Sequence, residues 1–257
     1  MVRPLTTPRF QPIQSRRIFE EILAQIEDLF ASGQLVQGDR LPPERDLAEQ
    51  FGTSRTSVRE AMRVLEALGV VEVKPGGDNG AVLVTHPARA FRDILQYQLA
   101  LRHIDMPALV EFRIVLESWT AGAAAERREA DALERLGKLL AAMAGEMPYT
   151  QFQEFDSAFH LEIARVSGND LFALTLEGAR TTIERAMLEA MAAAAAADWP
   201  ATHARLVDEH DAILEAIATG DSAAATGLMT AHIRDFYDQH LFLNAEDGAA
   251  PVSASTA

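Results

Sequence analysis

Four residues in the second half of the chain could together bind a metal ion: Asp156, His160, His210 and His232. Asp156 and His160 are four positions apart in FDSAFHLEIARVSGN, so on a helix a carboxylate and an imidazole leave the same face. His210 and His232 lie in two later segments of helical periodicity, VDEHDAILEAI and LMTAHIRDFY. A helix bundle can bring three such helices to one centre. Three imidazoles and one carboxylate would suit Zn²⁺, with Ni²⁺ or Mn²⁺ as alternatives.

The spacing of the histidines does not by itself select these ligands. A single histidine on a helix is more often a hydrogen-bonded polar residue than a metal ligand. His203 is seven positions before His210, and His240 is eight positions after His232, so each competitor shares roughly one helical face with its neighbour. Periodicity therefore leaves His203 and His240 open as alternatives.

A second chemical feature is an arginine in a largely apolar helical segment. Arg113 lies between Phe112 and Ile114 in the sequence EFRIVLE. It could be structural, with a buried stem and a guanidinium that pairs with Glu117 one turn later. Alternatively it points into a pocket, where its planar fork would hold the carboxylate of a small organic acid.

The first half of the chain predicts a different scaffold, two helices joined by a tight turn. The stretch LPPERDLAEQFGTSRTSVREAMRVLEAL predicts helices over residues 44–51 and 55–68. The Pro42-Pro43 pair precedes the first helix, Gly52 ends it, and Thr53 or Ser54 can cap the second. The second helix has an apolar stripe made of Val58, Ala61, Met62, Leu65 and Leu68.

The face of the second helix opposite that stripe carries Arg55 and Arg59, with Thr56 and Ser57 in the first turn. Arginines and hydroxyls at the start of a recognition helix are what reading of the DNA major groove requires. The alternative is an ordinary helical hairpin with a solvated arginine face. Residues 70–73 and 81–84 alternate like strands around a glycine-rich turn and predict a β-hairpin wing, which favours DNA binding.

The first 85 residues resemble the GntR superfamily of bacterial transcription regulators. The matching residues are LPPERDLAEQFGTSRTSVREAMRVLEALGVVEVKPGG, continuing to GAVLV. The resemblance implies that Arg45, Arg55 and Arg59 contact DNA and that Gly76 is the wing-tip glycine that approaches the minor groove. It also implies that Ser54, Thr56 and Ser57 contact phosphates or base edges.

The second half of the chain resembles the FCD-type effector domain of the FadR subfamily within that superfamily. The similarity rests on FDSAFHLEIARVSGND, on the EH of DEHDAILEAIATGD and on AHIRDF. In metal-binding members an Asp-xxx-His pair and two later histidines hold the ion, which implies Asp156, His160, His210 and His232 here. The same resemblance implies that Arg113 faces the effector cavity.

Composition and charge limit the classes of protein that fit. The 257-residue chain suits two domains, and it has no cysteine for a disulfide or a thiolate metal site. It contains no apolar run long enough to span a membrane and no signal peptide, so we expect a cytoplasmic protein. The net charge is −15, of which residues 1–85 carry −2 and residues 86–257 carry −13. An acidic second half would repel DNA and leave binding to a few arginines in the first.

We expect a mainly α protein with an N-terminal winged helix-turn-helix domain followed by an all-α bundle of six to seven helices. The predicted segments are a disordered tail at 1–14, the DNA-binding domain at 15–85, a linker at 86–92, the helical domain at 93–243 and a disordered tail at 244–257. The DNA-binding domain opens with a helix over 16–32, whose Ile18, Ile22, Ile26, Leu29 and Phe30 face inward. Helices follow at 90–102, 106–126, 130–144, 149–166, 171–195, 202–219 and 221–243, with Asn169 as a helix cap.

The predicted function is transcription regulation, with repression as the default. A homodimer would bind a palindromic operator in double-stranded DNA, since paired half-sites require two symmetric reading helices. A divalent metal ion and a small carboxylate effector in the bundle would control that binding. The alternatives are a metal sensor, in which the ion itself is the signal, and a metal-dependent hydrolase. We expect no enzyme, because no general base or nucleophile motif accompanies the candidate ligands.

Overall fold

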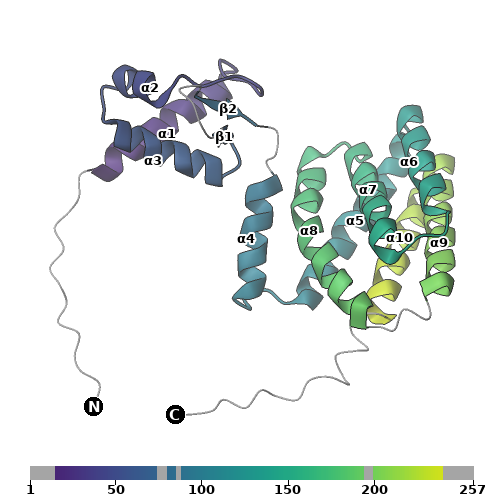
Figure 1. Ribbon diagram of the computed structural model, residues 1–257. Coiled ribbons are helices and arrows are strands. Elements are labelled where there is room, and N and C mark those ends of the chain that lie inside the picture. The colour runs from purple at the N-terminus through teal and green to yellow at the C-terminus, as the bar shows by residue number, and fades with distance from the viewer. Residues whose placement is uncertain (1–14, 74–79, 85–87, 194–198, 240–257) are drawn as a thin grey trace, which may run out of the picture. The chain divides into compact units, whose positions relative to one another are not determined.

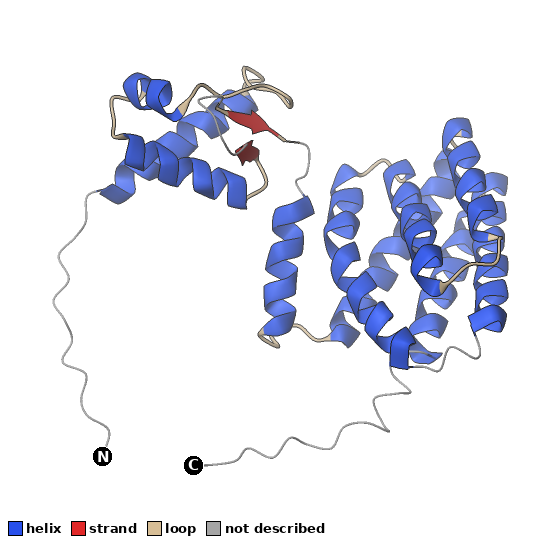
Figure 2. Ribbon diagram, viewed as in Figure 1, coloured by secondary structure: helices blue, strands red, loops and turns tan. Residues whose placement is uncertain are grey.

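The computed structural model describes residues 15–73, 80–84, 88–193 and 199–239, and divides the chain into two compact units after Ala90. The predicted terminal tails and the wing tip lie outside the described residues. Helices dominate both units, as Figure 2 shows, so the mainly α prediction is confirmed. Among the described residues, the helices labelled in Figure 1 run from α1 to α10 and the two strands form a hairpin.

The N-terminal unit consists of three helices and the β-hairpin. Helix α1 spans Ser15–Ala31, α2 spans Glu44–Gln50, α3 spans Arg55–Ala67, and strands β1 and β2 span Val71–Val73 and Ala81–Leu83. The strands are antiparallel. A buried core of Ile22, Ile26, Val58 and Leu65 joins α1 to α3, as the apolar spacing predicts. The spacing was wrong for Ile18 and Leu68, which are 40% and 49% exposed at the ends of their stripes.

The segment before α2 pairs with the outer edge of the hairpin. Leu83 N donates to Asp39 O at 2.9 Å, and Leu41 N donates to Ala81 O at 2.8 Å. Gly80 is required where this segment crosses the hairpin: its φ is +67°, and a Cβ there would lie 2.0 Å from Leu41 O. The backbone hydrogen bonds thus fix the hairpin against the start of the helix-turn-helix.

The C-terminal unit is an all-α bundle. Its helices are α4 (Ala88–Ala100), α5 (Met106–Arg127), α6 (Ala130–Met143), α7 (Tyr149–Val166), α8 (Asp170–Ala193), α9 (Trp199–Thr219) and α10 (Ser222–Tyr237). In the part of the chain that the structure describes, the predicted helices are confirmed to within about three residues; the predicted positions 194–195 and 240–243 lie outside it. Helix α9 begins three residues earlier than expected, because Pro200 is tolerated in a first turn. Within the described residues, no helix is long and apolar enough to cross a membrane.

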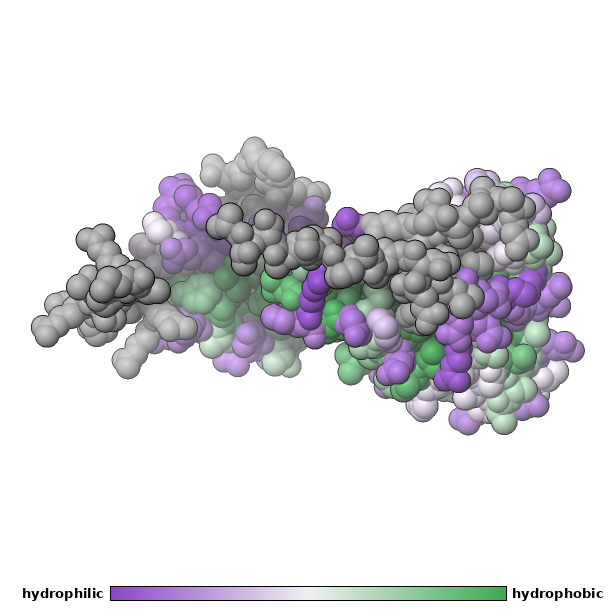
Figure 3. Space-filling view, turned by 90° about the horizontal axis from the view of Figure 1, so that it is seen from below, coloured by the Kyte–Doolittle hydropathy of each residue, from purple (hydrophilic) through white to green (hydrophobic). Residues whose placement is uncertain are grey.

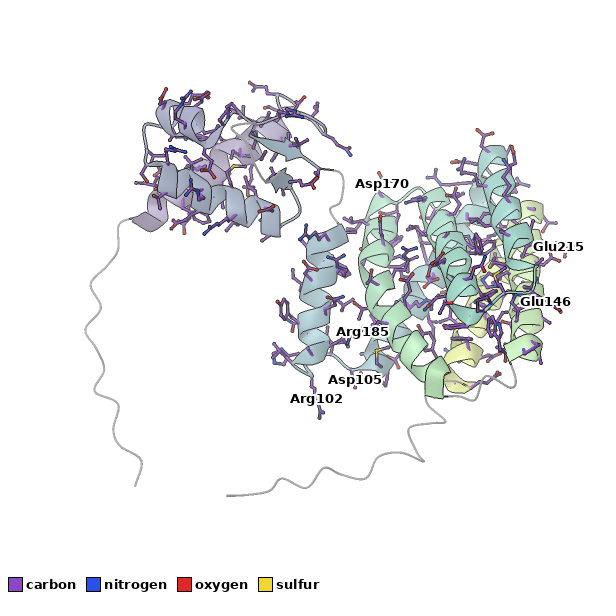
Figure 4. The ribbon with its side chains drawn as sticks, viewed as in Figure 1. Arg102, Asp105, Glu146, Asp170, Arg185 and Glu215 are labelled. Atoms are coloured by element: carbon purple, nitrogen blue, oxygen red, sulfur yellow. The ribbon has the colours of Figure 1, made fainter. Side chains whose placement is uncertain are left out.

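Helix α5 is the central element of the bundle and packs against α7, α8, α9 and α10. Its approach to α10 is close at Gly122, where a Cβ would lie 2.5 Å from Thr226 Oγ1. Side-chain caps start the neighbouring helices: Asp105 Oδ1 accepts from Ala108 N before α5, and Asn169 Oδ1 accepts from Leu171 N at α8. Asp105 and Asp170 mark these two helix starts in Figure 4. The predicted capping role of Asn169 is therefore confirmed.

Candidate metal centre and nucleic-acid interface

The four predicted metal ligands come from three helices and meet at one point inside the bundle. Asp156 and His160 lie on α7, His210 on α9 and His232 on α10. One ligand atom from each residue can be chosen so that all four atoms lie within 4.8 Å of one another. The three histidines are buried, and Asp156 is partly exposed. The donors of a tetrahedral ion with bonds of about 2.1 Å are about 3.4 Å apart, so the four atoms would have to move closer together to complete a shell.

Each of the three histidines has its Nδ1 atom next to an acceptor. His160 Nδ1 is 2.5 Å from Glu117 Oε2, and His232 Nδ1 is 2.7 Å from Glu209 Oε2. His210 Nδ1 is 2.6 Å from the backbone carbonyl oxygen of Leu206. Carboxylates and carbonyls only accept hydrogen bonds, and each of these contacts is shorter than any contact of Asp156 with the rings, so they favour a proton on Nδ1 of each neutral imidazole. The lone pair of each ring is then on Nε2, which is the atom available to a metal.

The buried Nε2 atoms are consistent with a cation at the centre of the cluster. The Nε2 atoms of His160 and His210 are buried and have no hydrogen-bond partner among the described residues, and His160 Nδ1 and Glu117 Oε2 meet as an ion pair without a hydrogen bond. The Oδ1 atom of Asp156 lies 3.1 Å from His210 Nε2 and 3.7 Å from His160 Nε2. Buried polar atoms without partners are costly, and a divalent ion would satisfy the two Nε2 atoms. The donor set of three nitrogens and one oxygen therefore fits a borderline ion such as Zn²⁺.

In the metal-free protein the cluster carries a proton on His160. Burial disfavours charged His160, but Glu117 and Asp156 outweigh burial and raise its pKa to about 9. Burial likewise opposes ionised Glu117, but Arg113 and His160 lower its pKa to about 2. Burial and then His210 lower the pKa of His232 to about 4, so this ring is neutral near pH 7. A metal ion would have to displace the proton from His160 Nε2.

The competing histidine His203 is not part of the cluster. Its Nε2 atom lies 2.8 Å from the carbonyl oxygen of Met143, and its ring packs against Phe152 and Trp199. This is the hydrogen-bonded polar role that an isolated helical histidine usually has. The other competitor, His240, lies outside the described residues.

A cavity of about 40 Å³ adjoins the cluster, enough for a few water molecules or a small ligand. Asp156, His160 and His232 line it together with Arg113 and Arg180. Arg113 has features of both interpretations. Its Nε pairs with Glu117 Oε1, as a structural arginine would, and its Nη1 donates to Tyr237 Oη at 3.0 Å at the wall of the cavity. The cavity therefore combines the candidate metal ligands with cationic and hydroxyl groups suited to a carboxylate.

Sequence reasoning missed Glu209, Tyr237 and Arg180 at this site. Glu209 directly precedes His210, but its carboxylate serves His232 on the next helix, which no local pattern reveals. Tyr237 and Arg180 line the cavity from α10 and α8. Spacing links Arg180 to Glu177 and Glu184, and it forms an ion pair with Glu184 at 3.2 Å.

The predicted DNA-contacting residues lie around the start of α3. Ser54 caps α3 by accepting from Ser57 N at 3.1 Å, and Arg55 and Thr56 are exposed. Arg59 forms a forked ion pair with Glu44 on α2, with Nη2 2.8 Å and Nε 3.0 Å from Oε2.

Arg45 is also exposed, and its Nε is 3.0 Å from Asp46 Oδ1. Gly76, the predicted wing-tip residue, lies outside the described residues. Figure 3 shows hydrophilic residues over much of the visible surface, which agrees with groups available to polar partners.

A helix-turn-helix with a hairpin, followed along the chain by a helical bundle with a polar cavity, is the architecture of a DNA-binding regulator with a separate helical domain. The comparisons with known proteins agree. Residues 18–78 match the bacterial regulatory proteins of the gntR family, and residues 108–235 match the FCD domain. The chain belongs to the GntR family of bacterial transcription regulators and carries an FCD domain. It is a DNA-binding transcription regulator and not an enzyme.

Two curated relatives and one solved structure show how far the similarity extends. The HTH-type transcriptional regulator LutR of Bacillus subtilis is 32% identical over 82% of this chain and 95% of its own length. The putative L-lactate dehydrogenase operon regulatory protein of Escherichia coli is 29% identical over 85% of this chain and 84% of its own. The structure of Streptococcus agalactiae GntR is 25% identical, with a TM-score of 0.67 over 86% of this chain and 99% of that one.

Proposed function

We propose that this regulator is a cytoplasmic repressor whose operator binding is controlled by a small carboxylate held at a divalent metal ion in the FCD domain. Zn²⁺ is the favoured ion, with Ni²⁺ and Mn²⁺ as alternatives, and Asp156, His160, His210 and His232 are the proposed ligands. The observation that carries the proposal is the shared cavity, where Asp156, His160 and His232 face Arg113. An ion with an open coordination position would take one carboxylate oxygen, and Arg113 would attract the anion from the cavity wall.

The names of the relatives suggest which acid to test first. One relative is named for an L-lactate dehydrogenase operon, so we propose L-lactate and similar hydroxy acids as first probes. The net charge of the site supports a monoanion. Arg113 and Arg180 are balanced by Glu117 and Glu184, and a divalent ion beside Asp156 leaves one positive charge.

The DNA-binding role is proposed for Arg45, Ser54, Arg55, Thr56, Ser57, Arg59 and Gly76. Arg55 and Arg59 would read base edges, and Ser54, Thr56 and Ser57 would contact phosphates or bases. Arg59 would exchange Glu44 for DNA on binding. In the protein without DNA, the carboxylate of Glu44 partly neutralises the guanidinium and so lowers its attraction for phosphates.

A homodimer is proposed because a palindromic operator needs two reading helices. Helix α5 offers an apolar face for the second copy: Phe112, Val115 and Trp119 follow helical spacing and remain exposed. Trp119 extends this face to α8 through an edge contact with Phe172 at 4.6 Å. Val115→Asp should lower the dimer fraction in sedimentation velocity, whereas Leu228→Asp on α10 should not. Equal dimer fractions in Val115→Asp and Leu228→Asp would show that this face of α5 is not the interface.

The test of the effector is an operator-binding titration with zinc-loaded and chelated protein, using L-lactate, other monocarboxylates and dicarboxylates. We expect a carboxylate to release the zinc-loaded protein from operator and to raise its melting temperature by mass action. Chelated protein should lose both responses. An unchanged operator affinity with every acid would reject the effector.

The second candidate is a metal sensor, which the complete four-residue cluster favours. In that case Zn²⁺ alone would change operator affinity, and added acids would change nothing further. The same titration, read first without acid, therefore separates a sensor from an effector-controlled regulator.

A further inference from the structure

Two of the three histidines are held by the same arrangement of residues. Arg113 Nε pairs with Glu117 Oε1 on α5, and Glu117 Oε2 is 2.5 Å from His160 Nδ1. Arg205 Nη1 pairs with Glu209 Oε1 on α9 at 2.5 Å, and Glu209 Oε2 is 2.7 Å from His232 Nδ1. In both cases arginine and glutamate are four residues apart on one helix, while the histidine comes from another. We call each arrangement an Arg–Glu–His relay.

The two oxygens of each glutamate have separate partners. A guanidinium can only donate, so the oxygen facing the arginine must accept. The second oxygen then faces Nδ1 of the histidine and keeps a proton there, which makes Nε2 the nitrogen that can bind a metal once it is unprotonated. The arginine therefore decides how the glutamate is oriented, and the glutamate decides which nitrogen of the histidine is available.

The two relays differ in their contact with solvent. The side chains of Arg113 and Glu117 are 12% and 1% exposed, and Arg113 lines the cavity. Those of Arg205 and Glu209 are 33% and 26% exposed and line a separate surface depression beside His232. We call the Arg113–Glu117–His160 arrangement the inner relay and the Arg205–Glu209–His232 arrangement the outer relay. Water reaches the carboxylate of Glu209 more readily than that of Glu117, so it can better replace a lost contact in the outer relay.

We propose that Glu117 and Glu209 are positioning residues that fix the metal-binding tautomer of His160 and His232, with Arg113 and Arg205 setting the orientation of each carboxylate. This inference rests on the proposed metal centre. The inner relay joins the proposed effector arginine to a proposed metal ligand, so the two proposed sites share one buried carboxylate.

The Glu117→Gln variant tests how the side chain at this position is oriented. Its carbonyl oxygen must face Arg113, so its amide group faces His160 and donates to Nδ1. The histidine then carries its proton on Nε2 and cannot ligate a metal. Removing Arg113 as well, in Glu117→Gln combined with Arg113→Met, lets the amide turn its oxygen towards His160. Arg113→Met should therefore restore part of the Zn²⁺ affinity that Glu117→Gln removes.

The experiment measures Zn²⁺ affinity of the full chain by competition with a chromogenic chelator. We expect Glu117→Gln to weaken Zn²⁺ binding roughly 10–100-fold, the range for outer-shell partners of metal ligands. Glu209→Gln should lose less, because water reaches the outer relay. The matched control is Glu162→Gln, whose carboxylate pairs with Arg135 at 2.7 Å and, among the described contacts, with no histidine. It should bind Zn²⁺ as the wild type does.

The second measurement is the tautomer of His232 by histidine ¹⁵N NMR in metal-free protein at pH 7. We expect Nδ1–H in the wild type and a shift towards Nε2–H in Glu209→Gln. This measurement still tests the proposal if Glu117→Gln fails to fold. Zn²⁺ affinity in Glu117→Gln equal to that of Glu162→Gln, no rescue by Arg113→Met, or an unchanged tautomer would each overturn the relays. A wild type that binds no Zn²⁺ but shows the expected tautomers would reject the metal centre and keep the relay geometry.

Discussion

Binding of Zn²⁺ to the metal-free protein should release about one proton per ion near pH 7.5. The proton comes from His160, whose pKa is about 9 because Glu117 and Asp156 outweigh the effect of burial. His232, with a pKa of about 4, and Asp156, with a pKa well below its usual value, are already deprotonated. The ion therefore has to displace one proton from His160 Nε2 before the fourth bond forms.

The size of the effect follows from the pKa of His160. A pH of 7.5 is about 1.5 units below the pKa of His160, so removing its proton costs ~2 kcal/mol of Zn²⁺ binding free energy. Apparent affinity should rise about tenfold per pH unit between roughly pH 6.5 and 8.5, and should level off above pH 9. Zn²⁺ affinity must rise with pH, because protons compete with the ion below the pKa of His160 and stop competing above it.

The assay is isothermal titration calorimetry of Zn²⁺ into metal-free protein in two buffers of different ionisation enthalpy. The difference in observed enthalpy between the buffers gives the number of protons released. Glu162→Gln is a suitable control, since it should release the same number as the wild type. Proton release near zero at pH 7.5, or affinity independent of pH from 6.5 to 8.5, would refute a protonated His160 in the metal-free cluster.

Three further outcomes can be checked. Metal analysis should show lower zinc content in His232→Ala and unchanged content in His203→Ala, because the His203 ring nitrogen is engaged by a backbone carbonyl; equal contents would contradict the ligand assignment. Arg55→Ala and Arg59→Ala should each weaken specific operator binding by about 1–3 kcal/mol in fluorescence anisotropy, and an equal loss on random DNA would make them phosphate contacts. Metal-free protein should lose stability as pH falls from about 4.5 to 2, where Glu117 becomes protonated in the folded state; equal melting temperatures at the two ends would oppose this.

The helix-turn-helix is readable from sequence because its signals are local. The cap at Ser54, the glycine at position 52 and the buried stripe from Val58 to Leu65 each depend on residues three or four positions apart. Helical geometry places such residues together whatever the rest of the chain does. The stripe fails only at Leu68, where the helix has ended and about half of the side chain is exposed.

Local spacing predicted only two of the four residues of the candidate metal centre. Asp156 and His160 are one turn apart on α7, so their common face is a local property. The choice of His210 over His203 is not local, because both lie on nearly the same face of α9. Seven residues raise a helix by about 10.5 Å, so the two rings lie at different depths in the bundle. The ring of His210 contacts His160 on α7 and His232 on α10, whereas the ring of His203 contacts Met143 at the end of α6.

Sequence alone determined the fold class, the two helical scaffolds and one carboxylate–histidine pair, since each depends on spacing within a single element. The tertiary structure decided the rest: that Glu117 and Glu209 reach histidines on other helices, and that Arg113 both pairs with Glu117 and faces the cavity. The physical reason is that a helix fixes the direction of each side chain about its own axis, whereas the rotation and axial offset between helices arise only when their apolar faces pack.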